Sequence, residues 1–286
     1  KRFGVYDLVD LFEITPSRSV PDHIAPPDYV TGKLLILPRK PEIKDAEQIQ
    51  GMRKSCKLAY SILNKPGITT DQIDDFVHNL TIESGAYPSP LKYKGFPKSV
   101  CTSVNNVVVH GIPDLRPLQD GDIINVDITV FFEGFHGDCS KTFTVGNVDA
   151  RGIQLINVAE ECLEAAIKSC GPNVPFNEIG NRIYYHAKKN HLTVLPDFYG
   201  HGIGCFFHFI LYTNDFLLLI ISTENRYPGL MKPGMTFTIE PVISHGSDCS
   251  ILLTDGWTVI TEDGSRAAQT ERTILITEDG AEILTK

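Results

Sequence analysis

Two aspartates in one short stretch carry the first sign of chemistry in this sequence. Residues 122–143, DIINVDITVFFEGFHGDCSKTF, are typical of a β-hairpin that turns at Glu133-Gly134, and its first strand alternates apolar and polar residues. This register puts Asp138 opposite Thr129, on the same polar face as Asp127, with the Cβ atoms of the two aspartates roughly 7 Å apart or less. Two carboxylates this close repel unless a proton or a cation lies between them. A lone hairpin, however, more often carries such a face simply toward solvent.

The second half of the chain repeats this pattern. VHGI at 109–112 matches GHGI at 200–203, and LQDGDIINVD at 118–127 matches MKPGMTFTIE at 231–240, with a glycine six residues before the final acid in both. A duplicated fold with a pseudo-two-fold axis brings both sets of polar residues together at its centre. The matched pairs are His110 with His201, Asp127 with Glu240, and Asp138 with Glu271.

These residue types favour a divalent-metal centre. Four carboxylates and one or two imidazoles suit ions that accept oxygen and nitrogen ligands. Four carboxylates exceed the needs of one small cation, but two cations can share two of them as bridges. Two ions about 3.5–4 Å apart lower the pKa of a bridging water and stabilise a tetrahedral intermediate. Hydrolysis of an amide is the natural use of such a centre.

Composition limits the classes of protein that remain. The chain has 286 residues, a net charge of −9 and a hydrophobic content of 42%, and it is long enough for one large domain or two small ones. The acidic balance argues against a nucleic-acid partner, and no apolar run reaches the length of a membrane span. Seven cysteines without a CxxC pair argue against a disulfide scaffold or a zinc finger and for a reducing compartment.

The helices and strands around the hairpin are predicted from the spacing of apolar residues and from proline, glycine and helix-capping residues. Residues 1–40 are rich in proline and predict an irregular arm, either extended along a domain or disordered, and residues 41–286 predict a single catalytic domain. Thr69 and Gln72 form a capping-box pattern at the start of a helix. Further helices are expected at about 45–64, 152–170 and 176–190, and short strands at 99–102 and 106–110.

Several motifs together resemble type 1 methionine aminopeptidases. They are KSVCTSVNNVVVHGIP, DGDIINVDITV, HGDCSKTF, GHGIG, FTIEP and the strand after QTER, and the resemblance covers about residues 20–286. It implies an α/β (α+β) pita-bread fold, in which helices back a curved antiparallel sheet. It also implies removal of the N-terminal methionine from nascent proteins whose second residue is small, by a dinuclear-metal-activated water. The implied metal ligands are Asp127, Asp138, His201, Glu240 and Glu271, with Asp138 and Glu271 as bridges and Co, Mn, Fe or Zn as the ions.

Other roles carry over by position from the same resemblance. His110 contacts substrate near the leaving amine, His208 holds the scissile peptide and stabilises its developing charge, and Glu240 counts with them among the catalytic residues. Thr129 and Gln269 support the metal ligands. The methionine pocket is lined by Tyr93, Phe96, Cys101, Phe207 and Trp257, whose aromatic rings and sulfur suit a flexible thioether. Core packing is the alternative explanation for these five residues.

Three features depart from the family pattern. The stretch FILYTNDFLLLIISTE that follows His208 is apolar and longer than the usual loop, and one hypothesis is that it is a translated intron. Arg272 replaces the usual histidine after the bridging acid, and strand alternation predicts that it points away from the metals. The turn ILNKPGITT between the first two helices is shorter than usual.

Two other functions stay open at this point. A proline-directed peptidase shares the fold, although KSVCTSVN and the aromatic pocket argue against it. A binding module without activity is the other, and such relatives typically lose metal ligands, whereas all five are present here. The resemblance further implies the N-termini of nascent polypeptides as substrates, the ribosome as a candidate partner, no nucleic-acid or membrane partner, and a monomer. The lead VPDHIAPPDYV and SVNNV resemble the mitochondrial or other organellar branch, with the cytoplasm as the alternative location.

Overall fold

The computed structural model describes residues 2–33, 42–63, 69–198, 200–208 and 229–286, and its centre is the expected hairpin. Strand β4 (Ile123–Phe132) pairs antiparallel with β5 (Phe135–Thr144), and Thr129 lies opposite Asp138. Glu133 and Gly134 both have positive φ, 49° and 89°, as the tight turn requires. The register predicted from the sequence is therefore confirmed.

This hairpin belongs to a seven-stranded antiparallel sheet. The other strands are β1 (Tyr87–Pro88), β2 (Cys101–Val104), β7 (Thr236–Ile239), β12 (Glu271–Ile276) and β13 (Ala281–Ile283). The pair β4–β5 from the first half of the chain joins the pair β7–β12 from the second half through contacts between β5 and β12. The sheet thus unites the two copies of the sequence repeat at its middle.

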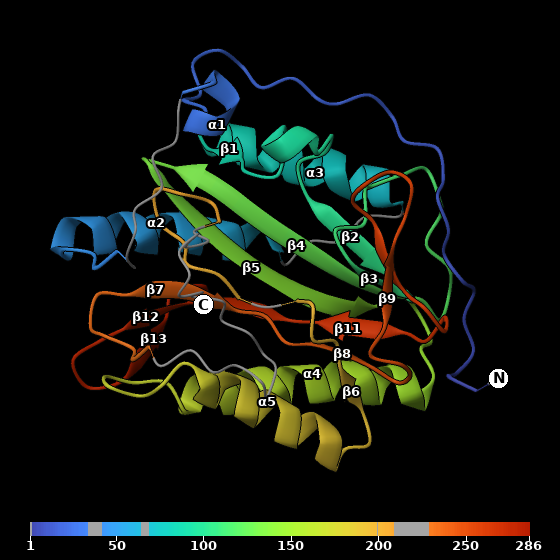
Figure 1. Ribbon diagram of the computed structural model, residues 1–286. Helices are drawn as coiled ribbons and strands as arrows, with labels where there is room; N and C mark the ends of the chain where they lie inside the picture. Colours follow the sequence, from blue (N-terminus) through green and yellow to red (C-terminus); the bar gives the residue numbers. More distant parts are fainter. Residues whose placement is uncertain (1, 34–41, 64–68, 199, 209–228) are drawn as a thin grey trace.

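Four long helices back the two halves of this sheet (Figure 1). Helices α2 (Ala46–Leu63) and α3 (Thr70–Glu83) lie over the β4–β5 half, and α4 (Ala150–Lys168) and α5 (Asn177–Lys189) lie over the other half. The dry face of β4 packs against α2 and α3 through Ile124, Val126, Ile128 and Val130. The capping box of Thr69 and Gln72 is present at the start of α3.

Two small sheets extend the strand layer. One has the order β3 (Val107–Val109), β10 (Val259–Thr261), β9 (Ser250–Leu252); the other has the order β11 (Ala267–Gln269), β8 (Val242–Ser244), β6 (Thr193–Val194). The strand expected at residues 99–102 begins two residues later, at Cys101. The backbone N–H of Ser99 donates to Asp74 of α3 instead of pairing with a neighbouring strand, and residue 100 is buried ahead of β2. The described helices include none that is long and apolar enough to cross a membrane.

The N-terminal arm, residues 2–33, runs along the outside of the body and then over its top (Figure 1). It is not wholly irregular, since α1 (Asp28–Thr31) forms a single turn that ends at Gly32 with φ 72°. Ile24 is buried against Tyr87 and Leu91. In these described residues the arm therefore packs on the domain.

Candidate metal centre and substrate pocket

One row of residues crosses the sheet and aims its side chains at the same space. Cys101 on β2 lies opposite Asp127 on β4, Asp127 lies opposite Ser140 on β5, and Ser140 lies opposite Glu271 on β12. Residues in one row of an antiparallel sheet share a face, and neighbouring strands are about 4.8 Å apart. Asp127 and Glu271 therefore lie on the same face, one strand apart on either side of Ser140.

Asp138 and Glu240 complete the set of carboxylates. Asp138 lies two residues before Ser140, so it shares that face, and its Oδ1 accepts a 2.7 Å hydrogen bond from Thr129 Oγ1. Glu240 directly follows β7. Its Oε1 accepts from Thr238 Oγ1 at 2.9 Å and its Oε2 from Gln269 Nε2 at 3.1 Å. Thr129 and Gln269 thus contact the carboxylates that they were expected to support.

His201 turns an acceptor nitrogen toward these acids. Its backbone N–H donates to Thr238 Oγ1 at 2.9 Å, and its Nδ1 lies 3.1 Å from the carbonyl oxygen of Gly202. A carbonyl only accepts, so Nδ1 carries the hydrogen and Nε2 keeps its lone pair. Nε2 lies 3.6 Å from Asp138 Oδ2 and 3.8 Å from Glu240 Oε1. Acceptor atoms therefore face one another across this gap.

Burial makes this concentration of acceptors costly. Ligand atoms of Asp138, His201 and Glu271 lie within 4.8 Å of one another, and all three residues are buried. Asp127 Oδ1 is buried without a hydrogen-bond partner among the described residues. Burial raises the pKa of Asp127 to about 7, and burial with the charge of Asp127 raises the pKa of Glu240 to about 8. Burial and the neighbouring carboxylates likewise raise the pKa values of Asp138 and Glu271 well above their usual range.

These residues fit divalent cations. Carboxylate oxygens and a neutral imidazole nitrogen are the ligands that such ions take, and the buried Asp127 Oδ1 without a partner is an atom that a cation satisfies. Thr129, Thr238 and Gln269 hold the carboxylates by their outer contacts, as partners of metal ligands commonly do.

Two further histidines face the same space. His110 follows β3 with φ 56°, and burial lowers its pKa to about 4. His208 lies against His201, with ring centroids 4.2 Å apart. Its Nδ1 is buried without a hydrogen-bond partner among the described residues. Burial, followed by the neighbouring histidines, lowers the pKa of His208 well below its usual value, so both rings are neutral at pH 7.

One pocket of about 870 Å³ contains every site residue named from the sequence. Its aromatic wall is continuous, because Tyr93 stacks on His208 at 5.0 Å and packs on Phe207 at 4.8 Å. Phe96 meets the ring of Trp257 edge-on at 5.1 Å. The predicted site residues in its lining are Tyr93, Phe96, Cys101, His110, Asp127, Asp138, His201, Phe207, His208, Glu240, Trp257 and Glu271.

Sequence reasoning missed several residues at this site. Thr238 binds both His201 and Glu240, and the alternation in FTIE could have placed it beside Glu240, two residues away. Lys94 also lines the pocket and has φ 47°, for which a single sequence gives no signal. His136 lies behind Phe207, with stacked rings 5.3 Å apart, and only its place in the HGD motif pointed to it.

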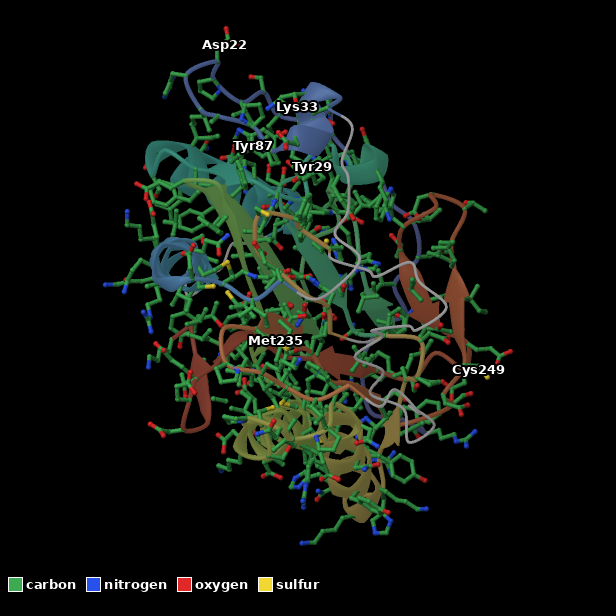
Figure 2. All side chains as sticks on the ribbon, turned by 60° about the vertical axis from the view of Figure 1, so that its left-hand side comes forward. Asp22, Tyr29, Lys33, Tyr87, Met235 and Cys249 are labelled. Carbon is green, nitrogen blue, oxygen red and sulfur yellow. The ribbon has the colours of Figure 1, made fainter. Side chains whose placement is uncertain are left out.

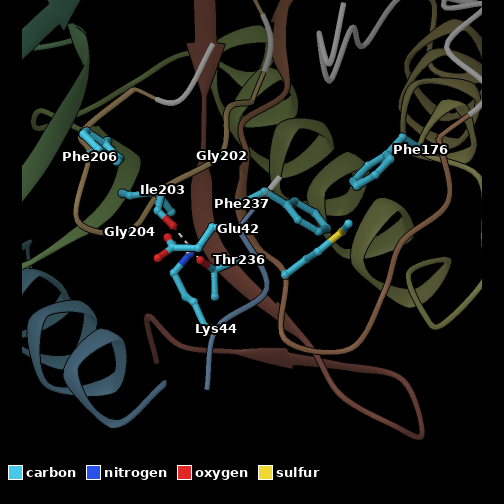
Figure 3. A pocket seen from close by; sticks show the side chains of 10 residues that line it. Glu42, Lys44, Phe176, Gly202, Ile203, Gly204, Phe206, Thr236 and Phe237 are labelled. Carbon is cyan, nitrogen blue, oxygen red and sulfur yellow. Dashed lines mark hydrogen bonds and ion pairs between the residues drawn. The ribbon is translucent and has the colours of Figure 1, made fainter. Parts of the chain in front are cut away.

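A smaller pocket lies along the segment that follows His201 (Figure 3). Its volume is about 410 Å³, and it is lined by Gly202, Ile203 and Thr236 among others. Lys44 Nζ pairs there with Glu42 Oε2 at 3.0 Å. This pocket contains none of the predicted site residues and no cluster of carboxylates with imidazoles.

The three departures have different outcomes. Arg272 donates to the carbonyl oxygens of Ser140 and Glu271 at 3.2 and 2.7 Å and lies over the ring of Tyr60 on α2. It therefore faces the helix layer, as strand alternation predicted. Residues 209–228 and 64–68 lie outside the described parts of the chain, and with them the apolar stretch and most of the short turn.

Comparisons with known proteins give a consistent result. A model of metallopeptidase family M24 matches residues 50–278. The chain is 50% identical over 280 residues to methionine aminopeptidase 1D, mitochondrial, of Danio rerio, covering 96% of this chain and 81% of that protein. It is 49% identical to methionine aminopeptidase 1D, chloroplastic/mitochondrial, of Arabidopsis thaliana, covering 96% of this chain and 78% of that protein.

Solved structures agree with these sequence matches. The crystal structure of methionine aminopeptidase from Rickettsia prowazekii has a TM-score of 0.81 at 40% identity and covers 86% of this chain and 100% of its own. The prolidase from Pyrococcus furiosus has a TM-score of 0.64 at 20% identity, covering 85% of this chain and 65% of its own, and shares the fold alone. The pita-bread fold expected from the sequence is confirmed.

Proposed function

This chain belongs to metallopeptidase family M24 as a type 1 methionine aminopeptidase, and from that premise we propose how it works. It removes the N-terminal methionine from nascent polypeptides whose second residue is small. Asp127, Asp138, His201, Glu240 and Glu271 would hold two divalent ions, drawn from Co, Mn, Fe and Zn.

The observation that carries this proposal is the meeting of acceptor atoms at the site. The Nε2 lone pair of His201 faces the oxygens of Asp138 and Glu240 at 3.6 and 3.8 Å, and Glu271 lies in the same buried group. These acceptors repel one another unless a proton or a cation lies between them, and divalent cations would satisfy every member of the group. When bound, the ions would supply the Lewis acidity that activates a water molecule and polarises the scissile carbonyl.

The chain's own residues bind and orient the substrate. The apolar pocket bounded by Phe96, Cys101 and Trp257 takes the methionine side chain. The neutral His208 donates a hydrogen bond to the oxygen of the scissile peptide, where negative charge develops. His110 contacts the substrate near its leaving amine. Glu240, held by Thr238 and Gln269, takes a proton from the attacking water and returns it to the nitrogen of the leaving amine.

A comparison of two peptides tests the substrate class. Prolidases share the fold, so a proline-directed activity is the competing function. The purified, metal-reconstituted protein is expected to cleave Met-Ala-Ser and to leave an X-Pro peptide intact. Met-Phe-Ser in the same assay tests the second residue, and it should be cleaved far more slowly than Met-Ala-Ser. Preference for the X-Pro peptide would contradict the proposed function.

Location and partners extend the same proposal. Relatives from Danio rerio, Mus musculus and Homo sapiens carry the designation mitochondrial, which supports an organellar location, with the cytoplasm as the alternative. Fractionation of cells that express the full-length gene separates these two locations.

The ribosome is the partner to test, because nascent N-termini emerge there, and co-sedimentation with ribosomes is the measurement. We expect the isolated enzyme to be a monomer, which its sedimentation coefficient checks.

A further inference from the structure

One wall of the substrate pocket is built mostly from a segment that lies between two strands of the sheet. This wall segment, residues 90–101, contributes Tyr93, Phe96 and Cys101 to the pocket. Strand β1 ends at residue 88 and β2 begins only at residue 101. Between them Lys92 and Lys94 have φ values of 66° and 47°, which are unfavourable for residues with side chains. Such a backbone persists only where its surroundings over-determine it, so something must hold the wall segment in place.

The N-terminal arm holds one end of the wall segment through Arg18. Its Nε lies 2.9 Å from Asp74 Oδ2 and its Nη1 lies 2.8 Å from Asp75 Oδ1. The other oxygen of Asp74 accepts a 2.7 Å hydrogen bond from the backbone N–H of Ser99. The Asp74 side chain is fully buried, so a single carboxylate joins the arm to the wall segment by two charge-assisted contacts.

A second route connects the same region of the arm to Lys98. The Lys98 side chain is fully buried, and its Nζ donates to Asp71 Oδ1 at 2.7 Å and to Thr15 Oγ1 at 2.6 Å. His78 adds a third connection, since its ring nitrogens contact Ser99 Oγ at 2.8 Å and the carbonyl oxygen of Ser19 at 3.1 Å. Because buried charges are strongly disfavoured when a partner is lost, this network fixes the residues directly before Cys101.

Tyr29 of the arm holds the other end of the wall segment. Its hydroxyl donates to the carbonyl oxygen of Ser89 at 2.5 Å, just before the segment begins. Its ring packs edge-on against Tyr93, with centroids 5.1 Å apart, and Tyr93 in turn stacks on His208. Figure 2 shows Tyr29 and Tyr87 in the upper part of the molecule, below Asp22 at its outer edge.

We propose that the N-terminal arm determines substrate specificity by positioning the methionine pocket, with Arg18 and Tyr29 as its two positioning residues. The inference rests on the proposed function, because it takes the aromatic wall as the binding site of the methionine side chain. Neither residue lines the pocket itself. Each acts through the wall segment, Arg18 on the side of Phe96 and Cys101 and Tyr29 on the side of Tyr93.

A purely stabilising arm would behave differently in one measurable respect. Loss of stability lowers the amount of active enzyme and reduces kcat/KM for all substrates by the same factor. Displacement of one pocket wall changes the fit of one side chain relative to another. The ratio of kcat/KM for Met-Ala-Ser to that for Leu-Ala-Ser is independent of the active fraction, so it separates the two roles.

The test measures this ratio in the metal-reconstituted full chain and its variants. Arg18→Ala and Tyr29→Leu are each expected to lower the preference for methionine over leucine about tenfold, since a single misfitted group in an apolar pocket changes discrimination by that order. The variant Tyr29→Phe keeps the aromatic ring against Tyr93, so it should retain most of the preference for methionine over leucine. Lys33→Ala is the matched control, because Lys33 pairs with Asp28 at 3.1 Å on the exposed surface of the same arm.

Three outcomes are distinguishable. If the parent enzyme does not cleave Met-Ala-Ser, the proposed function fails before the arm is tested. If the parent cleaves it and the ratio in both Arg18→Ala and Tyr29→Leu stays within twofold of the parent, the arm does not position the pocket and the inference is overturned. If Arg18→Ala does not fold, Tyr29→Leu and Tyr29→Phe decide the question, because they leave the buried charges of Asp74 and Lys98 paired.

Discussion

Asp127 and Glu271 lie opposite the same residue, Ser140, from the strands on either side of it. One acid comes from the first copy of the sequence repeat and the other from the second. The sheet therefore forms the site by joining β5 to β12, and neither half of the chain contains it alone. Because the two acids lie in one row of the sheet, a change in the register of either strand would move one of them to the opposite face.

Thr238 should control metal affinity although it carries no charge. It accepts from the backbone N–H of His201 and donates to Glu240 Oε1, both at 2.9 Å. We expect Thr238→Val to weaken metal binding about 10–100-fold, as the loss of an outer partner of a metal ligand typically does. Thr236→Val is the control on the same strand, since Thr236 Oγ1 donates to the carbonyl of Ile203 instead. Titration calorimetry with Mn²⁺ on the chelated proteins measures both, and equal affinities would contradict this role for Thr238.

His208 should act on the transition state more than on substrate binding. Its ring is neutral and stacked on Tyr93, so it can donate to an oxygen on which charge develops. His208→Ala is expected to lower kcat for Met-Ala-Ser by about 100-fold or more with KM little changed, as for the loss of one oxyanion donor. Steady-state kinetics gives both constants. A rise in KM with kcat unchanged would show that His208 only holds the ground state.

The acid stability of the fold should depend on Asp149, far from the proposed metal ligands. Burial alone would raise its pKa, but hydrogen bonds from the backbone of Val5 and Gly152 and from the buried Arg266 lower that pKa to about 2. The folded-state pKa lies below the unfolded value of about 3.9, so the stabilisation is complete above that value and is lost as the pH falls through about 2. Asp149→Ala should cost about 3–5 kcal/mol at pH 7, because it leaves a buried guanidinium without its partner.

Urea denaturation from pH 7 to pH 2 checks this expectation. The difference in free energy of unfolding between the parent and Asp149→Ala should narrow below about pH 4. Thr69→Ala is the control, since it removes a helix N-cap without removing a charge and should cost about 1 kcal/mol at every pH. A difference for Asp149→Ala that does not change with pH would exclude the ionic contribution.

The hairpin and its register could be predicted because they follow from local sequence patterns, whereas the set of proposed ligand residues came from the resemblance to a family and stays a prediction. Alternation, a two-residue turn and the repeat place Asp127 and Asp138 on one face without any knowledge of distant contacts. The hydrogen bond from Tyr29 to Ser89 joins residues 60 positions apart and leaves no periodic signal in the sequence. The contacts between the arm and the pocket wall could therefore not be predicted from the sequence. The strand expected at residue 99 was misplaced for a similar reason, because Ser99 is bonded to Asp74 of α3.

Asp138 offers the most direct test of the metal centre. It lies 3.6 Å from His201 Nε2 and within the same buried group as Glu271, and we take it to bridge two ions. The measurement is the turnover of Met-Ala-Ser by chelated protein as Mn²⁺ is added stepwise, with bound metal counted in parallel, for the parent and Asp138→Ala. The parent should gain activity only with added metal and bind two ions, and Asp138→Ala should lose at least one ion and nearly all turnover. Full turnover by Asp138→Ala, or by the parent in the presence of chelator, would contradict the account.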